Sequence, residues 1–510
     1  MKRILLLGIC IVVSGLLLGG VIGWAAGNTL IVGVTQDVET LDPANHRSRI
    51  TETTIRNMYD GLVTRTSGME VVPELAVSWE QVSTTEWIFY LQKDVKWHDG
   101  EKFTAEDVKF TIDRLVKEGM INGMTSPRKS LLDPVNGAEV IDTYTVKLTL
   151  DAPMPHLLAF LPFQEMVAKH YVEEFGDDYL AENAMGTGPF ELVRWDKGTQ
   201  VIMKRFDDYY GGSPDIPPVG SAQVETLIFK VIPELSSRIA ALQAGEVDII
   251  TEVSADLMGQ IESDPNLEIV TCNGTRSYML GMNCVTGEFA DKRVRQAMNY
   301  AIDMEQIVAA LYSGLGQAIP TILSPNAIGY ADLDPYGYDP DKAKELLAQA
   351  GYSNGLSVVI DAQDSLKNIA EACAQMLREI GIDASTQVWE WSVLKPELLA
   401  NKRQMWVTSW GNGSMDPQGI FVPKLGTGER GNYTGYSNTT LNLLFALSKI
   451  TLDSDERLTC FIEGQKIVYD ECPMVWGYVT KEIYGKSTRV QGWNPSPDGK
   501  LNMHDVSLSG

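Results

Sequence analysis

The sequence has few of the residue types that build metal centres and disulfide frameworks. Its 510 residues include six cysteines and five histidines. The five cysteines after Cys10 are spread from Cys272 to Cys472, no pair of them has the spacing of a zinc site, and no His-x-x-x-His pair occurs. We therefore expect no clustered metal site and no disulfide framework. A single bridge stays open, for which Cys272 and Cys284 are the candidates.

Basic residues are also scarce. Lys and Arg number 42 against 67 Asp and Glu, which gives a formal net charge of −25. Proteins that bind nucleic acids or anionic lipids present a basic face to them. The composition therefore argues against both kinds of partner. It does not predict the charge of a ligand, because the charge of a pocket is independent of that of the surface.

Long apolar runs are missing everywhere except at the N-terminus. There, Lys2 and Arg3 precede an apolar run from Ile4 to Val21, and small residues follow at 23–27. This order is typical of a secretory signal peptide, so we predict a cleaved leader over residues 1–26 and a periplasmic or extracellular protein. An uncleaved anchor is the alternative, since the run is long enough to span a bilayer. Cys10 lies too early for a lipid-attachment site.

Motifs of catalysis are missing as well. The sequence contains neither a Gly-x-Ser-x-Gly elbow nor a Gly-x-x-x-x-Gly-Lys phosphate loop. The tetrapeptide from Ser126 to Lys129 matches the Ser-x-x-Lys of acyl-transfer enzymes, but neither Ser-Asp-Asn nor Lys-Thr-Gly follows it. We expect a protein that is not an enzyme and that carries no cofactor. A secreted hydrolase is the alternative from another class.

What the sequence does contain is an alternation of helical and strand patterns, which predicts an α/β protein. Thr104 with Asp107 three residues later predicts a capped helix. A helix is expected over 235–244, ended by a glycine and followed by a strand. Strands are predicted over 387–391 and 405–410, where side chains alternate in character.

The last two strands carry an unusual density of tryptophan. Four fall within 22 residues: Trp389, Trp391, Trp406 and Trp410. Rigid aromatic walls with few polar anchors are typical of a ligand pocket, although a sheet core is the alternative and is preferred for Trp406. The loop after Trp410 holds Gly411 and Gly413, which permit close approach of a ligand to the backbone, although a plain strand-to-helix turn is the alternative that the pattern alone favours.

A series of short motifs follows one order along the chain. They are Thr40–Pro43, Tyr59–Leu62, Pro73–Ala76, Val95–Glu101, Phe103–Val108, Gly186–Phe190, Ala241–Asp248, Asp291–Ala297, Tyr338–Pro340, Trp410–Pro417 and Gly435–Asn438. In this order they resemble family 5 of the extracellular solute-binding proteins, over roughly residues 30–500.

The resemblance implies a type II-like periplasmic binding protein fold of cluster C, with two lobes around a cleft and an extra domain. Lobe I would be discontinuous, over 27–58, 187–275 and 480–510. The extra domain would be inserted over 59–186, and lobe II would span 276–479. The segments near 186–190 and 271–278 would be hinges.

The resemblance also implies a function. Such proteins, expected to be monomers, capture a small molecule by lobe closure and deliver it to the permease subunits of an ABC importer. The ligand would be a short peptide, an amino-acid derivative or an oligosaccharide. Ten residues are implied as ligand contacts: Arg49, Thr51, Thr53, Tyr278, Asn283, Trp391, Trp410, Asn412, Gly413 and Asp416.

One position departs from the pattern of peptide-binding relatives. They carry an aspartate that pairs with the peptide amine where this chain has Gly413. Asp416 is the candidate substitute, but in the family pattern it holds the turn before Pro417. This puts a peptide ligand in question. The absence of histidine from Trp410 to Phe421 likewise disfavours a nickel ligand.

Overall fold

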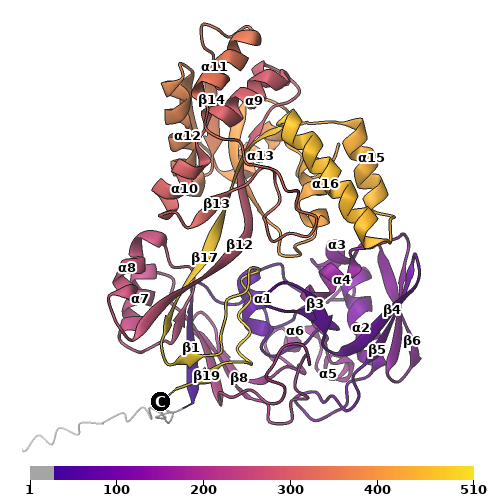
Figure 1. Cartoon of the computed structure of the whole chain (residues 1–510). Coiled ribbons are helices and arrows are strands. Elements are labelled where there is room, and N and C mark those ends of the chain that lie inside the picture. The colour runs from indigo at the N-terminus through magenta and orange to yellow at the C-terminus, as the bar shows by residue number, and fades with distance from the viewer. Residues whose placement is uncertain (1–27, 510) are drawn as a thin grey trace, which may run out of the picture.

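The computed structural model describes residues 28–509, so the predicted leader over 1–26 lies outside the described residues. The chain forms an upper and a lower half, and the long strands β12 and β17 run from one into the other (Figure 1). Helices α9 to α12 lie around the top of the upper half, and α1 to α6 lie in the lower half. Within the described residues no helix is both long and apolar enough to cross a membrane.

One mixed sheet connects the two halves. Its strand order is β15-β14-β16-β12-β17-β11-β1-β10-β9-β8, and β13 pairs with β17 outside this path. The antiparallel pairing of β12 (Leu267–Met282) with β17 (Met474–Ser487) shifts register between Asn273 and Ser277. The remaining strands are β1 (Thr29–Val34), β8 (Phe190–Asp196), β9 (Gln200–Arg205), β10 (Thr226–Val231), β11 (Ile249–Ile250), β13 (Gly316–Ala318), β14 (Ser357–Ala362), β15 (Asp383–Val388) and β16 (Met405–Gly411).

A second, antiparallel sheet in the lower half has the order β4-β5-β7-β6. In β5 the side chains of Trp87, Phe89 and Leu91 are buried, as period-two alternation requires. They share a core with α2 (Ala105–Val116), and the predicted Thr104–Asp107 capping box is confirmed. This region also contains β2 (Val63–Arg65), β3 (Val71–Pro73), β4 (Ala76–Ser83), β5 (Glu86–Leu91), β6 (Val135–Asp142), β7 (Thr145–Leu150), α3 (Lys129–Leu132), α4 (Leu157–Phe160), η1 (Leu161–Phe163), α5 (Lys169–Phe175) and α6 (Asp177–Leu180).

The helices of the upper half cover the β14, β15 and β16 end of the mixed sheet. Ile360 and Met405 from the strands are fully buried against Leu377 and Met298 from the helices. The elements of this half are η3 (Glu288–Ala290), α9 (Lys292–Ala301), α10 (Met304–Tyr312), α11 (Pro340–Gln349), η4 (Asp364–Leu366), α12 (Lys367–Glu379), α13 (Trp391–Leu399), η5 (Pro417–Gly419), α14 (Phe421–Leu425), α15 (Thr439–Ser448) and α16 (Ser454–Glu471).

The lower half is completed by segments from both ends of the described chain. The predicted helix over 235–244 is confirmed as α7 (Leu235–Gln243). Leu30 and Val32 of β1 lie in one core with Leu501 and Met503 near the C-terminus. The other elements are α1 (Arg49–Ile55), η2 (Ala255–Leu257), α8 (Met258–Glu262), β18 (Val490–Gln491) and β19 (Ser507–Leu508).

The predicted strand over 387–391 is wrong in its second half. Strand β15 ends at Val388, and Trp391 begins helix α13. The Trp389 indole N–H turns inward and donates to Asp361 Oδ1 at 2.8 Å, and the Trp391 ring lies edge-on to Tyr433. Trp389 and Trp391 therefore do not form one face of a strand.

Two further expectations have plain outcomes. Trp406 is 2% exposed and packs with Leu394 and Leu398, which confirms it as a core residue. Among the described residues all five cysteines are free, so the candidate bridge between Cys272 and Cys284 is not formed.

Candidate ligand cleft

A cavity of about 790 Å³ lies between the halves, and we refer to it as the main cleft. Its walls come from the start of α1, from the segments around Arg128 and Phe163, and from the end of β16 with the loop that follows. Cavities of this size hold ligands the size of a small peptide. Residues far apart in the sequence therefore meet around one volume.

The lower wall is built on an ionised cluster. Glu52 in the first turn of α1 contacts Lys500 Nζ at 2.8 Å and Arg128 Nη2 at 3.0 Å. Burial opposes ionisation of Glu52, but Lys500 and Arg128 lower its pKa to about 2. Arg49, at the start of the same helix, is exposed and reaches Glu482 of β17 at 3.1 Å. This wall is therefore charged and held rigidly by ion pairs.

The upper wall is a tightly bonded loop after β16. The Trp410 indole N–H donates to the carbonyl of Gly419 at 3.1 Å. Asp416 is buried and forms a two-pronged pair with Arg457 of α16, at 2.6 and 2.8 Å. From the lower half, Arg65 donates to the carbonyl of Gly413 at 2.8 Å. The loop that faces the cleft is thus held by Arg457 of its own half and by a hydrogen bond from Arg65 of the other half.

A second cavity of about 510 Å³ adjoins the main cleft, and we refer to it as the Lys424 compartment. Arg276, Ser409 and Trp410 line both cavities and form their shared wall. The compartment is otherwise lined by Tyr278, Gln363, Ser365, Leu366, Trp391, Val407, Thr408, Lys424 and Tyr433.

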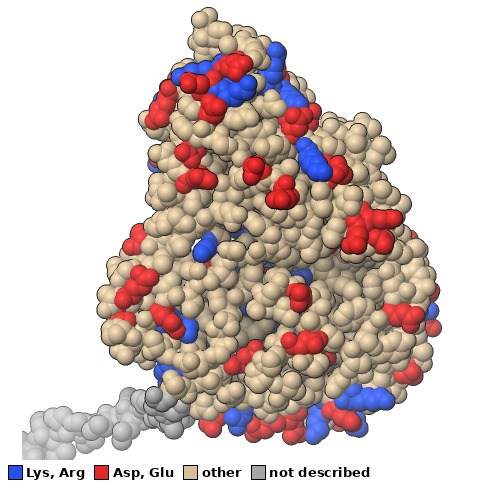
Figure 2. All heavy atoms as spheres, viewed as in Figure 1, with Lys and Arg blue, Asp and Glu red and all other residues tan. Residues whose placement is uncertain are grey.

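The charge of the main cleft is opposite in sign to that of the chain. Its charged lining residues are the cations Arg47, Arg49, Arg128, Arg276, Arg430, Lys449 and Lys500 and the acids Glu52, Asp133, Glu429 and Asp498. Burial lowers the pKa of His156, also in the lining, to about 4, so this ring is neutral at neutral pH. In Figure 2 the surface is hollowed between the halves and basic side chains are visible there, whereas acidic ones are scattered over the surroundings. A cationic site thus lies within an acidic protein.

Six of the ten predicted contact residues line these cavities. Arg49, Asn412 and Gly413 line the main cleft, Trp410 lines both cavities, and Tyr278 and Trp391 line the Lys424 compartment. Their role in binding stays a prediction.

The structure does not bring the other four to either cavity. Thr51 accepts from the Glu39 amide, and Thr53 donates to the carbonyl of Gly499. Asn283 donates to the carbonyls of Asn401 and Arg403. Asp416 is occupied by Arg457. All four side chains are buried and bonded within the protein.

Three cations of the site have no signal in the sequence. Arg276 lies on β12, Lys424 on α14 and Arg430 in the loop beyond it. None of the three belongs to a sequence motif, so the sequence does not show whether a carboxylate elsewhere in the fold neutralises it. Only the tertiary structure brings them to the cavities that Trp410 lines.

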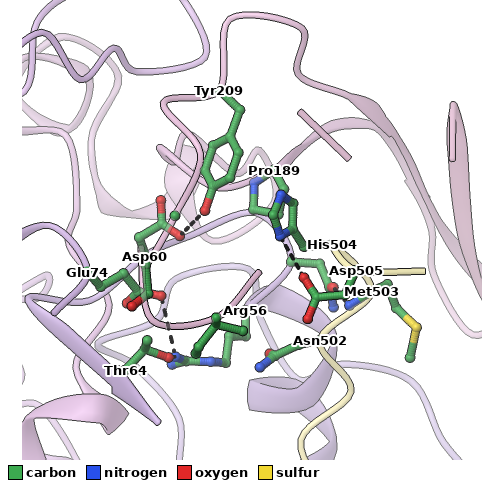
Figure 3. A pocket seen from close by; sticks show the side chains of 14 residues that line it. Arg56, Asp60, Thr64, Glu74, Pro189, Tyr209, Asn502, Met503, His504 and Asp505 are labelled. Atoms are coloured by element: carbon green, nitrogen blue, oxygen red, sulfur yellow. Dashed lines mark hydrogen bonds and ion pairs between the residues drawn. The ribbon is translucent and has the colours of Figure 1, made fainter. Parts of the chain in front are cut away.

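A smaller cavity, of about 60 Å³, lies within the lower half beside a cluster of buried polar groups (Figure 3). Tyr209 donates to Asp60 Oδ1 at 3.3 Å, and Arg56 contacts Glu74 at 3.7 Å. Burial raises the pKa of Asp60 to about 6 and that of Glu74 to about 8. The volume suffices for a few waters, not for a solute. We interpret the cluster as a junction between chain segments.

The described residues contain no group of three or more side chains that could hold a metal ion. The Ser-x-x-Lys candidate is also separated: Ser126 donates to the carbonyl of Ala44 at 2.6 Å, whereas Lys129 pairs with Glu118 at 3.2 Å. Both side chains are engaged in structural contacts.

The mixed sheet that runs through both halves, the additional antiparallel sheet and the cleft between the halves define a cluster C periplasmic binding protein. The structure of HbpA2 from Haemophilus parasuis superposes with a TM-score of 0.87 at 25% identity, covering 94% of this chain and 100% of that one.

The family follows from the sequence comparison. The model of the bacterial extracellular solute-binding proteins, family 5, matches residues 70–432, and the chain belongs to this family of non-catalytic substrate-binding proteins of ABC transporters. The chain is 27% identical over 475 residues to the dipeptide-binding protein of Escherichia coli, covering 86% of each. It is 26% identical over 486 residues to heme-binding protein A of Haemophilus influenzae, covering 89% of this chain and 87% of that protein.

Proposed function

We propose that this protein is exported, acts as a monomer, and captures a short peptide or a similar small polar solute for delivery to the permease of an ABC importer. The single observation that carries this proposal is the main cleft, whose 790 Å³ are lined by residues of both halves. A solute in contact with both walls favours the arrangement in which the halves are closed.

We propose the lobe boundaries on the same basis. Lobe I comprises 27–58, 187–275 and 480–510, the inserted domain 59–186, and lobe II 276–479. The register shift between Asn273 and Ser277 in the β12–β17 pair supports a change of lobe near residue 275. An irregular position in a paired strand is a natural place for the pair to bend.

An oligosaccharide is the second candidate, because Trp410 lines both cavities and Trp391 lines the Lys424 compartment. Three contacts within the protein weigh against it. Lys424 Nζ and Arg430 Cζ lie 4.9 and 5.0 Å from the centroid of the Trp410 ring. The Trp391 ring is already packed edge-on against Tyr433. A sugar would compete with the protein's own groups for these surfaces, so we place the polar solute first.

Binding assays on the purified, refolded protein test the proposal. Thermal-shift titrations with defined di- and tripeptide pools and with oligosaccharide pools separate the two solute classes. A solute at a hundredfold excess over its dissociation constant stabilises the folded state by about 2.7 kcal/mol. Stabilisation by oligosaccharides alone would reverse the order of the candidates. If neither the peptides nor the oligosaccharides stabilise the refolded protein, and no small molecule co-purifies with the protein before it is unfolded, the capture function fails.

A further inference from the structure

The Lys424 compartment has an unusual charge composition. Two of its lining residues are cations, Arg276 and Lys424, and no Asp or Glu occurs among the described residues that line it. Its remaining polar groups are hydroxyls and one amide, and its other walls are aromatic or aliphatic. A cavity with two positive charges and no negative one is complementary to an anion.

Of these two cations, Lys424 gives the stronger indication of an anionic ligand, because it is buried without a counter-ion. Its side chain is 1% exposed, and its ammonium donates to Thr408 Oγ1 at 3.2 Å. It also lies 4.9 Å from the Trp410 ring centroid and 5.4 Å from that of Tyr433. No carboxylate of the described residues forms an ion pair with it. An ammonium offers three donors, so a buried one with a single hydrogen bond and no counter-ion is costly for the fold.

A neighbouring cation increases this cost. The guanidinium of Arg430 lies 5.0 Å from the same Trp410 ring. Arg276, the second cation of the compartment, is exposed, donates to Ser409 Oγ at 3.2 Å and has no partner among the described acids. Burial and, to a smaller extent, repulsion from Arg430 together lower the pKa of Lys424 to about 8. An anion beside Lys424 would relieve both effects.

A lysine that is buried away from the cavities has a different environment. Lys486 of β17 is 8% exposed, contacts Glu268 at 2.5 Å and donates to the carbonyl of Val490 at 2.9 Å. The chain therefore supplies a counter-charge to this lysine, which serves as a structural contact. At Lys424 it leaves the charge facing a cavity that adjoins the main cleft.

We propose that the Lys424 compartment binds an acidic group of the solute, with the Lys424 ammonium and the Arg276 guanidinium as its cationic contacts, so that the transported solute is an organic anion. This inference rests on the proposed capture function and specifies its solute class. A carboxylate and a phosphate share the chemistry that these two cations recognise.

Matched pairs of probes test the inference by isothermal titration calorimetry. The carboxylate arm compares Ala-Ala-Gln with its own C-terminal amide and, both as C-terminal amides, Ala-Ala-Glu with Ala-Ala-Gln, so that each neutral member lacks any carboxylate. The phosphate arm compares the C-terminal amides of Ala-Ala-phosphoserine and Ala-Ala-Ser. A non-peptide arm compares glucose 6-phosphate with glucose. We expect the acidic member of at least one pair to bind roughly 10- to 100-fold more tightly, the range for a hydrogen-bonded charge pair. The arm in which the acidic probe binds more tightly shows whether the compartment prefers a carboxylate or a phosphate.

The variant Lys424→Met separates a binding role from a structural one. Removing an uncompensated buried charge should raise the melting temperature of the ligand-free protein, while most of the preference for the acidic probe is lost. A lysine that stabilises the fold would give a lower melting temperature. Lys466→Met, at an exposed position of α16 paired with Glu463, is the matched control and should change neither quantity.

Each result has a defined consequence. Equal affinity for the acidic and neutral members of every pair overturns the inference and leaves the capture function standing. An acidic preference that survives in Lys424→Met overturns the assignment of the compartment. If no probe binds and no small molecule is retained by the protein from mixed anionic, neutral and cationic metabolite pools, the capture function fails, and this inference fails with it.

Discussion

Two tryptophans on strand β16 have different surroundings. Trp406 is 2% exposed and fills a core with Leu394 and Leu398, and a Cβ placed on Gly281 would come within 2.4 Å of its ring. Trp410, four residues on, is half-buried and lines both cavities. The position along the strand, not the residue type, therefore decides whether an indole stabilises the fold or faces the solute.

This difference predicts opposite effects of the same truncation. Trp410→Ala should weaken solute binding by about 1–3 kcal/mol with little loss of stability, because a packed aromatic contact with the solute is removed. Trp406→Ala should lower the free energy of unfolding by about 3–5 kcal/mol, because it leaves a cavity in a core. Calorimetric binding and denaturant unfolding of both variants measure the two quantities. Unchanged affinity in Trp410→Ala would remove this residue from the site.

At the scale of the element, local signals predicted structure well where one interaction is decisive. The Thr104–Asp107 box predicted a helix start, which is confirmed. The strand predicted over 387–391 was wrong in part because these residues alternate in character as a strand does. In addition, Pro396 inside α13 interrupts the pattern by which a helix is recognised. The strand ends at Val388 because Trp389 turns to bond Asp361 of β14, a partner that is distant in sequence.

The site was predictable only in part, for a related reason. The four tryptophans and the glycine-containing loop after β16 stand out locally, and Trp391, Trp410 and the loop do line the cavities, whereas Trp389 and Trp406 do not. The cations do not stand out, since a lone Arg276 or Lys424 is an ordinary residue in its own segment. Whether such a charge is neutralised depends on which residues the fold places beside it. The same limit applies to Asp416, whose pairing with Arg457 of α16 no local pattern indicates.

The loop from Gly411 to Gly419 depends on that ion pair. Asp416→Ala should lower the free energy of unfolding by about 3–5 kcal/mol, because it leaves the Arg457 guanidinium buried without its counter-charge. Denaturant unfolding measures the change. Glu463→Ala, which removes an exposed pair with Lys466, is the control and should change stability by less than about 1 kcal/mol. Intact stability combined with lost binding would instead make Asp416 a contact of the solute.

The buried cluster of Figure 3 joins the segments around Arg56, Tyr209 and His504, and it predicts how stability depends on pH. Burial raises the pKa of Glu74 from 4.5 to about 8 and that of Asp60 from 3.8 to about 6. At these two carboxyls the folded state holds protons that the unfolded state has released, so their contribution to stability is greatest at low pH and falls as the pH rises from about 4 to about 8.

Glu74→Gln removes the larger of these two ionisations. In this variant the free energy of unfolding should fall less steeply between pH 5 and pH 8 than in the native protein. Urea unfolding across that range measures both slopes, and Glu118→Gln, at an exposed position, should keep the native slope. Equal slopes in Glu74→Gln and the native protein would mean that Glu74 is already ionised at pH 5.

At the scale of the whole molecule, the halves share the continuous strands β12 and β17 and meet at a few polar contacts. Arg65 of the lower half donates to the carbonyls of Gly413 and Ser414 in the upper half. Small polar contacts between parts of a chain permit relative motion, whereas a large apolar interface would prevent it. This arrangement supports closure by bending of the strand pair.

Closure predicts a change in dimensions on binding. A saturating solute should lower the radius of gyration measured by small-angle X-ray scattering, because the halves approach each other around it. Trp410→Ala should give the same decrease at a higher solute concentration, because the variant binds more weakly but bends at the same strands. A radius of gyration that stays constant at full occupancy would mean that the solute enters a cleft that is already closed.

The contrast between an acidic molecule and its basic cleft affects the rates at which an anionic solute associates and dissociates. An anion that approaches a chain of net charge −25 is repelled while it is still distant, and it is attracted only when it reaches the entrance. At moderate ionic strength the Debye length is roughly 10 Å, so salt screens the repulsion between the anion and the distant surface charges. Salt therefore raises the association rate. The same salt weakens the attraction between the anion and the cations of the cleft, so it raises the dissociation rate. A higher ionic strength would therefore favour fast exchange of the solute over long retention.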